Sequence, residues 1–131
     1  MRTTLGAALV LAAALAQKDK PPTIAEAMRK LNGGANSMTR ILGLDLKDKD
    51  PDWEDIQETT KEYAQLVATL EKGTPPRGDK ASWKRRAAAY AANARALDAA
   101  ARRKDRTAAS AALARITQSC NACHEVHRPK E

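Results

Sequence analysis

The sequence contains no phenylalanine, and aromatic residues make up only 3% of its 131 residues. It has no stretch in which apolar and polar residues alternate, the pattern that predicts β-strands. Alanine is abundant instead, and it falls within four amphipathic segments separated by Pro, Gly and Asp. The pattern predicts an all-α fold, and the length is sufficient for one domain.

Long apolar runs are also scarce, and the longest lies near the start of the chain. Residues 5–16 (LGAALVLAAALA) carry no charge, follow the single positive charge of Arg2, and end in a small-x-small pattern at Ala14 and Ala16. A membrane-spanning helix needs about 20 apolar residues, so this run is too short. We interpret residues 1–16 as a cleavable signal peptide and residues 17–131 as the mature domain. The mature protein is therefore expected in the periplasm, without stable membrane insertion.

Acidic residues are outnumbered by basic ones, 16 against 23, which gives a net charge of +7. Loss of residues 1–16 would remove one Arg and no acid, leaving 22 basic residues against 16 acidic ones and a charge of +6. Such a charge is compatible with nucleic acid, an anionic membrane or an acidic protein partner. Export argues against nucleic acid. The alternative to a docking role is that the charges only keep the protein soluble. The same two interpretations apply to the basic residues at positions 84–86 and 102–106.

Helix boundary signals divide the chain into four predicted helices. Thr23 and Glu26 form a capping box at the start of the first helix, and Gly33–Gly34 interrupt that helix at positions where glycine weakens helical structure. The second helix is predicted to start near Asp52, the third within residues 79–82 and the fourth after Asp105. Short links between such helices predict an antiparallel four-helix bundle. The residues predicted to face its core, helix by helix, are Ile24, Ala27, Met28, Leu31, Ala35, Met38, Ile41 and Leu42; Trp53, Ile56, Thr60, Tyr63, Val67 and Leu70; Trp83, Ala87, Tyr90, Ala94, Leu97 and Ala101; and Ala109, Ala112, Leu113, Ile116, Cys120, Cys123, His124 and His127.

The two cysteines of the sequence belong to one motif near its end. Cys120, Cys123 and His124 form C-x-x-C-H, the attachment signature of c-type haem. Two thiols three residues apart can form thioethers with the two vinyl groups of one porphyrin, and the adjacent imidazole can bind the iron. On a helix these three side chains point the same way. The motif predicts one covalently bound haem c, with a neutral His124 as an axial ligand of the iron.

Two other chemistries remain open for the motif. A thiol–disulfide site usually lies at the start of a helix that follows a strand, and no strand is predicted here. A zinc site could use Cys120, Cys123, His124 and His127, but such sites normally draw their ligands from two separate segments. A haem-free thiol or zinc module is thus the less favoured alternative. We interpret His127 as a solvent-facing or haem-edge residue.

A four-helix chain with C-x-x-C-H close to its C-terminus resembles the class II cytochromes c, the cytochrome c′ family. The resemblance extends over the predicted mature chain and is strongest in the last 50 residues, from Trp83 through the Asp105 turn to residues 120–128. Arg128, four residues after His124, matches a basic residue that is common beside the proximal face of the haem in that family. The lack of Phe and the Gly33–Gly34 pair depart from the family pattern.

The resemblance implies one of two functions, neither of them enzymatic. In low-spin, six-coordinate members a Met from the first helix is the second axial ligand, and the protein transfers electrons to a redox partner. That position falls here on Met28, with Met38 as an alternative. In five-coordinate members the sixth position is open and binds nitric oxide or carbon monoxide. Electron transfer with His124 and Met28 as ligands is the favoured function. Family members often form homodimers, which the resemblance also implies.

Overall fold

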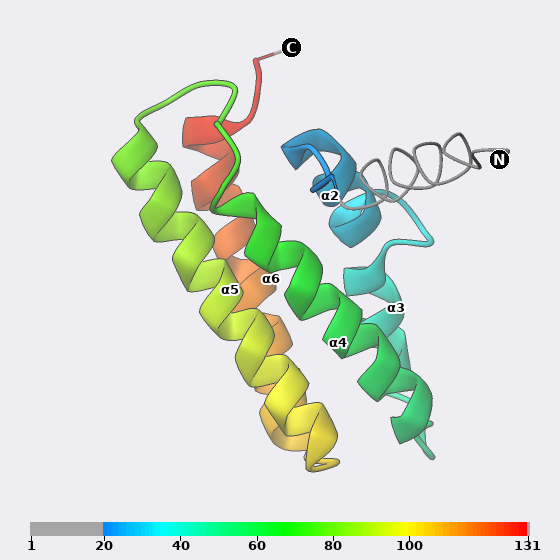
Figure 1. The fold of residues 1–131 in the computed structure, drawn as a ribbon. Helices are drawn as coiled ribbons and strands as arrows, with labels where there is room; N and C mark the ends of the chain where they lie inside the picture. Colours follow the sequence, from blue (N-terminus) through cyan, green and yellow to red (C-terminus); the bar gives the residue numbers. More distant parts are fainter. Residues whose placement is uncertain (1–19, 131) are drawn as a thin grey trace, which may run out of the picture.

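The computed structural model describes residues 20–130, and this part of the chain contains five α-helices and no strand (Figure 1). The predicted all-α class is therefore confirmed. The predicted signal peptide and its cleavage site lie outside the described residues. No helix within residues 20–130 is long and apolar enough to cross a membrane. The helices are α2 (Ile24–Asn32), α3 (Met38–Asp45), α4 (Trp53–Leu70), α5 (Lys80–Arg102) and α6 (Arg106–His127).

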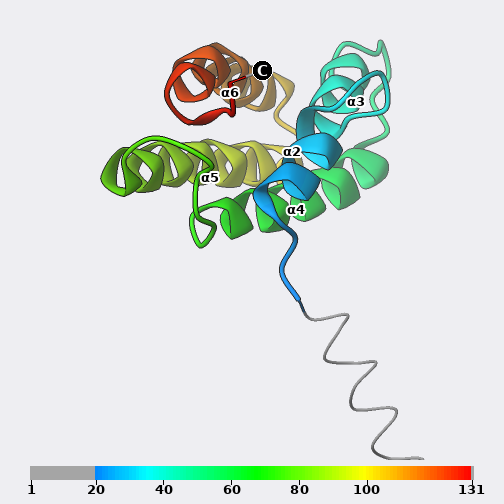
Figure 2. The same cartoon turned by 90° about the horizontal axis from the view of Figure 1, so that it is seen from above.

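The three long helices form the main body of the bundle. Helix α5 packs against both α4 and α6, and short connections join the three in sequence. The two short helices α2 and α3 pack against α4, and α3 also contacts α6. Figure 2 shows α5 and α4 side by side, with α6 and α3 above them and α2 above α4. Helices α2 and α3 therefore together take the place of the first helix of the predicted bundle.

Each helix begins at a side chain that accepts a hydrogen bond from the backbone N–H three residues later. These N-cap residues are Thr23, Ser37, Asp52, Asp79 and Asp105. An N-cap of this kind typically stabilises a helix by about 1 kcal/mol, because it satisfies one of the free N–H groups of the first turn. The starts predicted at Thr23, near Asp52, within residues 79–82 and after Asp105 are confirmed.

The glycine pair separates α2 from α3. A Cβ atom on Gly33 would lie 2.5 Å from the carbonyl oxygen of Arg29, and Gly34 has φ = 78°, a value that side chains disfavour. The predicted interruption at Gly33–Gly34 is confirmed, but two residues assigned to the apolar stripe are not buried. Ala35 is exposed in the interruption, and Ile41 is 36% exposed on α3 because the break changes the direction of the chain.

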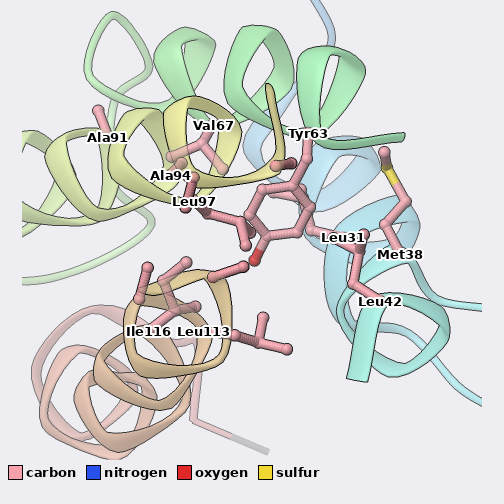
Figure 3. Packing of buried hydrophobic residues seen from close by; sticks show 14 of the residues in the cluster. Leu31, Met38, Leu42, Tyr63, Val67, Ala91, Ala94, Leu97, Leu113 and Ile116 are labelled. Atoms are coloured by element: carbon pink, nitrogen blue, oxygen red, sulfur yellow. The ribbon is translucent and has the colours of Figure 1, made fainter. Parts of the chain in front are cut away.

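The core combines large side chains from α2, α3 and α4 with small ones from α5. Tyr63 is the largest fully buried side chain, and its ring extends from α4 into the space between Leu31 and Leu97 (Figure 3). Alanines face the core along much of α5, which allows close approach of the neighbouring helices. The buried apolar residues are Ala27, Leu31, Met38, Leu42, Leu46, Ile56, Tyr63, Val67, Leu70, Trp83, Ala87, Ala91, Ala94, Leu97, Ala100, Ala101, Ala109, Ala112, Leu113 and Ile116.

Candidate functional site

A cavity of about 830 Å³ lies between the start of α2, the loop after α4 and the last turns of α6. Figure 1 shows these three segments at the same end of the molecule. A smaller cavity of about 130 Å³ adjoins it. Both are lined by Met28, Asn32, Trp83, Cys123 and His124. These shared residues mark the boundary between the two cavities, which together form one mainly apolar site.

The three motif residues lie on one face of α6 and border this site. Cys123 and His124 line both cavities, and Cys120 lines the smaller one. All three side chains are partly buried, and the Cys120 thiol donates to the carbonyl oxygen of Ile116 at 3.3 Å. The structure therefore brings the predicted attachment residues together, facing a space that can receive a large ligand.

The surroundings of the motif keep its side chains uncharged. Burial raises the pKa of both the Cys120 and the Cys123 thiol, and for Cys123 the nearby Arg86 offsets part of this increase. Both cysteines are free thiols. Burial, and secondly the positive charge of Arg128, lower the pKa of His124. A neutral imidazole is the form that binds a metal, whereas thiol–disulfide chemistry is promoted by thiols of lowered pKa.

Met28 reaches the same site from α2. It is partly buried, packs against the core and lines both cavities together with His124. Met38, the alternative, is 7% exposed in the core and does not line either cavity. The structure therefore places Met28, and not Met38, beside the motif.

His127 is 2% exposed, so the solvent-facing interpretation of this residue was wrong. Its Nε2 atom lies 3.1 Å from the Ser82 hydroxyl, and its Nδ1 atom lies 3.0 Å from the carbonyl oxygen of Arg77. Its ring stacks edge-on against Trp83, with 5.4 Å between the ring centroids. His127 also lines the larger cavity. It joins the end of α6 to α5 and to the preceding loop.

Arg77 and Trp83 hold the same end of the bundle together. The guanidinium group of Arg77 donates to the backbone carbonyls of Glu125 and Arg128, which satisfies acceptors at the end of α6. The indole N–H of Trp83 donates to the carbonyl oxygen of Leu70 at 3.0 Å. The Arg128 side chain itself is exposed at the rim of the larger cavity.

A ring of polar side chains lies behind Met28. Asn32 Nδ2 is 3.7 Å from Met28 Sδ and 3.5 Å from the Tyr90 hydroxyl, and Asn32 Oδ1 accepts from the Thr39 hydroxyl at 2.7 Å. The Tyr63 hydroxyl lies 2.9 Å from that of Thr39 and 2.7 Å from that of Tyr90. Burial raises the pKa of both tyrosines, so both hydroxyls stay protonated at neutral pH.

The cytochrome c′ family model, described as Cytochrome C', matches residues 77–128, which comprise α5, α6 and the residues just before α5. Over these 52 of its 131 residues, the chain is similar to the cytochrome c′ family. No curated protein and no solved structure gave a significant match. The match includes Cys120, Cys123, His124 and Arg128, whereas Met28 lies outside the matched range. The protein is therefore a c-type cytochrome, and similarity to this family implies covalently bound haem c with iron.

The residues around the site fit the haem that similarity to the cytochrome c′ family implies. Cys123, His124 and the Met28 side chain line the mainly apolar cavity of about 830 Å³, and Cys120 lines the smaller cavity that adjoins it. Within residues 20–130, no group of three or more His, Cys, Asp or Glu side chains is arranged to hold a metal ion by itself. This donor set is therefore suited to haem attachment and not to a zinc ion held by side chains alone.

The sequence did not indicate three residues that shape this site. They are Asn32, Arg77 and Ser82, whose hydrogen-bond partners lie 58, 51 and 45 positions away along the chain. The signal for Asn32 was its place directly before the glycine pair. The only signal for Arg77 and Ser82 was their position near the predicted start of the third helix.

Proposed function

We propose that this cytochrome carries single electrons through one haem whose iron has His124 and Met28 as axial ligands. The observation that supports this proposal is that Met28 on α2 and His124 on α6 line the same two cavities. Two potential iron ligands on different helices that face one site match the arrangement that six-coordinate iron requires.

The chain's own residues have distinct roles in this proposal. Cys120 and Cys123 hold the group covalently, which fixes its position relative to α6. Burial keeps His124 neutral, so its imidazole can bind iron without first losing a proton. When bound, haem c supplies an iron that takes up and releases one electron. A thioether ligand opposite an imidazole favours the reduced state and raises the reduction potential, and the mainly apolar lining favours the less charged state.

The second candidate function is the binding of nitric oxide or carbon monoxide at a five-coordinate site. The observation in its favour is that Met28 already has a partner in the protein, because its sulfur accepts from Asn32 Nδ2 at 3.7 Å and its side chain packs on the core. A methionine satisfied in this way is stable in its position without an iron bond.

The absorption spectrum of the dithionite-reduced protein distinguishes the two functions. We expect a sharp, split low-spin spectrum that carbon monoxide leaves unchanged. Met28→Ala should convert it to a broad high-spin spectrum that shifts at once with the gas. Met38→Leu is the matched control, because Met38 lies in the core, and it should behave like the unmodified protein. A wild-type spectrum that shifts with carbon monoxide, or one that Met28→Ala does not change, would reject Met28 as a ligand and leave gas binding as the function.

We further propose that the carrier works in the periplasm as an exported protein and is not an enzyme. Its support is the apolar segment of residues 5–16 and the C-x-x-C-H motif of c-type cytochromes. Without residues 1–16 its net charge of +6, from 22 basic and 16 acidic residues, suits a redox partner with an acidic surface. Recovery of haem-containing protein from the periplasmic fraction, lacking its first 16 residues, would support export; full-length protein in the cytoplasm would contradict it.

A further inference from the structure

The hydroxyl and amide protons behind Met28 can be assigned one by one. Thr39 uses its only proton on Asn32 Oδ1, so at its second contact it accepts from Tyr63. Tyr63 has then used its proton, and it accepts from Tyr90. Tyr90 in turn accepts from Asn32 Nδ2. Every donor in this ring has one acceptor, and all four hydrogen bonds run in the same direction around it.

The amide of Asn32 has one N–H left after this assignment, and it points to Met28 Sδ at 3.7 Å. The opposite orientation of the amide would place its oxygen against the sulfur, where neither atom can donate. Only the orientation with nitrogen beside Met28 satisfies every member of the set. The ring therefore fixes the orientation of Asn32, and Asn32 presents a donor to the sulfur.

This arrangement depends on the break between α2 and α3. Asn32 is the last residue of α2, and Thr39 lies in the first turn of α3. The turn at Gly33–Gly34 brings the Thr39 hydroxyl to Asn32, whereas Tyr63 and Tyr90 reach the ring from α4 and α5. Four helices thus determine where the amide of Asn32 points.

We infer that Asn32 is a positioning residue that holds the Met28 sulfur in the haem cavity and tunes its strength as an iron ligand. This inference rests on the proposed His124/Met28 ligation. A thioether sulfur has two lone pairs, so one can accept from Asn32 while the other remains free to bind iron. The hydrogen bond restricts the side chain before binding, which strengthens ligation, and it withdraws electron density from the sulfur. The withdrawal of electron density favours the reduced state of a His/Met site and raises its reduction potential.

The test compares Asn32→Leu with Thr39→Val in the haem-loaded protein. Asn32→Leu removes the donor to the sulfur, so the reduction potential should fall and the affinity of the ferrous protein for carbon monoxide should rise. We expect a rise of about fivefold, the equilibrium factor that one neutral hydrogen bond typically supplies. Thr39→Val opens the same ring but keeps the Asn32 amide that can donate to the sulfur, so it is the matched control and should cause a clearly smaller change in both quantities.

A double-mutant cycle with Met28→Ala separates positioning from a general structural effect. If Asn32 acts through the sulfur, Asn32→Leu should change neither the potential nor the gas affinity once Met28 is absent. An equal effect in both backgrounds would overturn the inference, as would no effect in either.

If Asn32→Leu fails to fold, Asn32→Ala and Tyr90→Phe allow the same comparison. Asn32→Ala removes the donor to the sulfur, whereas Tyr90→Phe keeps the Asn32 amide and removes only its partner in the ring. If Met28→Ala leaves the low-spin spectrum unchanged, the proposed ligation is wrong and the inference is wrong with it. If Met28→Ala changes the spectrum but the Asn32 variants change neither the potential nor the gas affinity, the ligation stands and only the inference is wrong.

Discussion

The imidazole Nε2 of His127 lies 3.1 Å from the Ser82 hydroxyl, and this contact joins the last turn of α6 to the first turn of α5. Because His127 follows His124 by one helical turn, the contact also fixes the segment that carries the predicted iron ligand. The imidazole uses both of its ring nitrogens in this position. The structure around His127 is therefore a support for the site and not a part of its metal chemistry.

His127→Ala should reduce the free energy of unfolding by about 2–4 kcal/mol. The substitution leaves a cavity beside Trp83 and removes partners from Ser82 and from the Arg77 carbonyl. Urea unfolding of the haem-loaded protein measures this change, and Lys130→Ala, at an exposed position, is a control that should have little effect. The absorption spectrum of folded His127→Ala should remain that of the unmodified protein. A spectrum that loses its low-spin character would instead indicate that His127 is an iron ligand.

The glycine at position 78 should tolerate no side chain. It has φ = 84°, and a Cβ atom there would lie 2.7 Å from His127 Nδ1 and 2.9 Å from the Val126 carbonyl oxygen. Gly78→Ala should therefore destabilise the protein by about 1–3 kcal/mol. Gly43→Ala is its control, because it lies in α3 with only an ordinary contact at 3.8 Å to Leu113. That change should be neutral or stabilise the protein by up to about 1 kcal/mol. Equal unfolding midpoints for the two variants would contradict the predicted close packing around His127.

The features that the sequence predicts correctly depend on residues close together in the chain. Asp52 and Asp105 cap the helices that they precede, because an N-cap bonds the backbone only three residues ahead. Cys120, Cys123 and His124 share one face because their spacing follows the helical repeat. Met28 was proposed from the family resemblance, and the structure places it at the same site.

Residues that act through distant partners could not be identified in the same way. The burial of His127 depends on Ser82 and Arg77, which are 45 and 50 positions earlier in the chain. The contact of Asn32 with Tyr90 spans 58 positions. Such contacts depend on how α2, α5 and α6 pack, and local periodicity contains no information about that packing. Ile41 shows the same limit, because its apparent place on an apolar stripe assumed a helix that Gly33–Gly34 interrupt.

Electron transfer to an acidic partner should become slower as salt is added. Screening shortens the reach of surface charges to about 8 Å at an ionic strength of 0.15 M, so attraction between a basic carrier and an acidic partner weakens. The rate of reduction by an acidic redox protein, followed by stopped flow between low and high salt, measures this effect. Reversal of exposed charges, as in Lys84→Glu with Arg85→Glu, should reduce the low-salt rate and its salt dependence. A rate that does not depend on salt would contradict electrostatic docking and leave solubility as the role of these charges.

Asp45→Asn should stabilise the protein at neutral pH. Asp45 lies at the end of α3, and its Oδ2 atom is buried without a hydrogen-bond partner in the described part of the chain. Burial raises the pKa of this carboxyl group, and the nearby negative charges of Asp55, Asp48 and Asp52 raise it further. Because the folded protein binds this proton more tightly than the unfolded chain, the stabilising contribution of Asp45 is present below its ordinary pKa of 3.8 and is lost as the pH rises through the folded value.

The gain from Asp45→Asn should therefore depend on pH. At pH 7 the substitution removes an unfavourable charge, and we expect a gain of about 0.5 kcal/mol, since water screens much of the repulsion at this partly exposed site. At pH 3 Asp45 is already protonated, so the gain should disappear. Urea unfolding of both proteins at the two pH values measures the difference. Asp50→Asn, in the exposed link before α4, should give no comparable gain. A gain for Asp45→Asn that is the same at pH 3 and pH 7 would show that the amide improves packing and that the buried charge is not the cause.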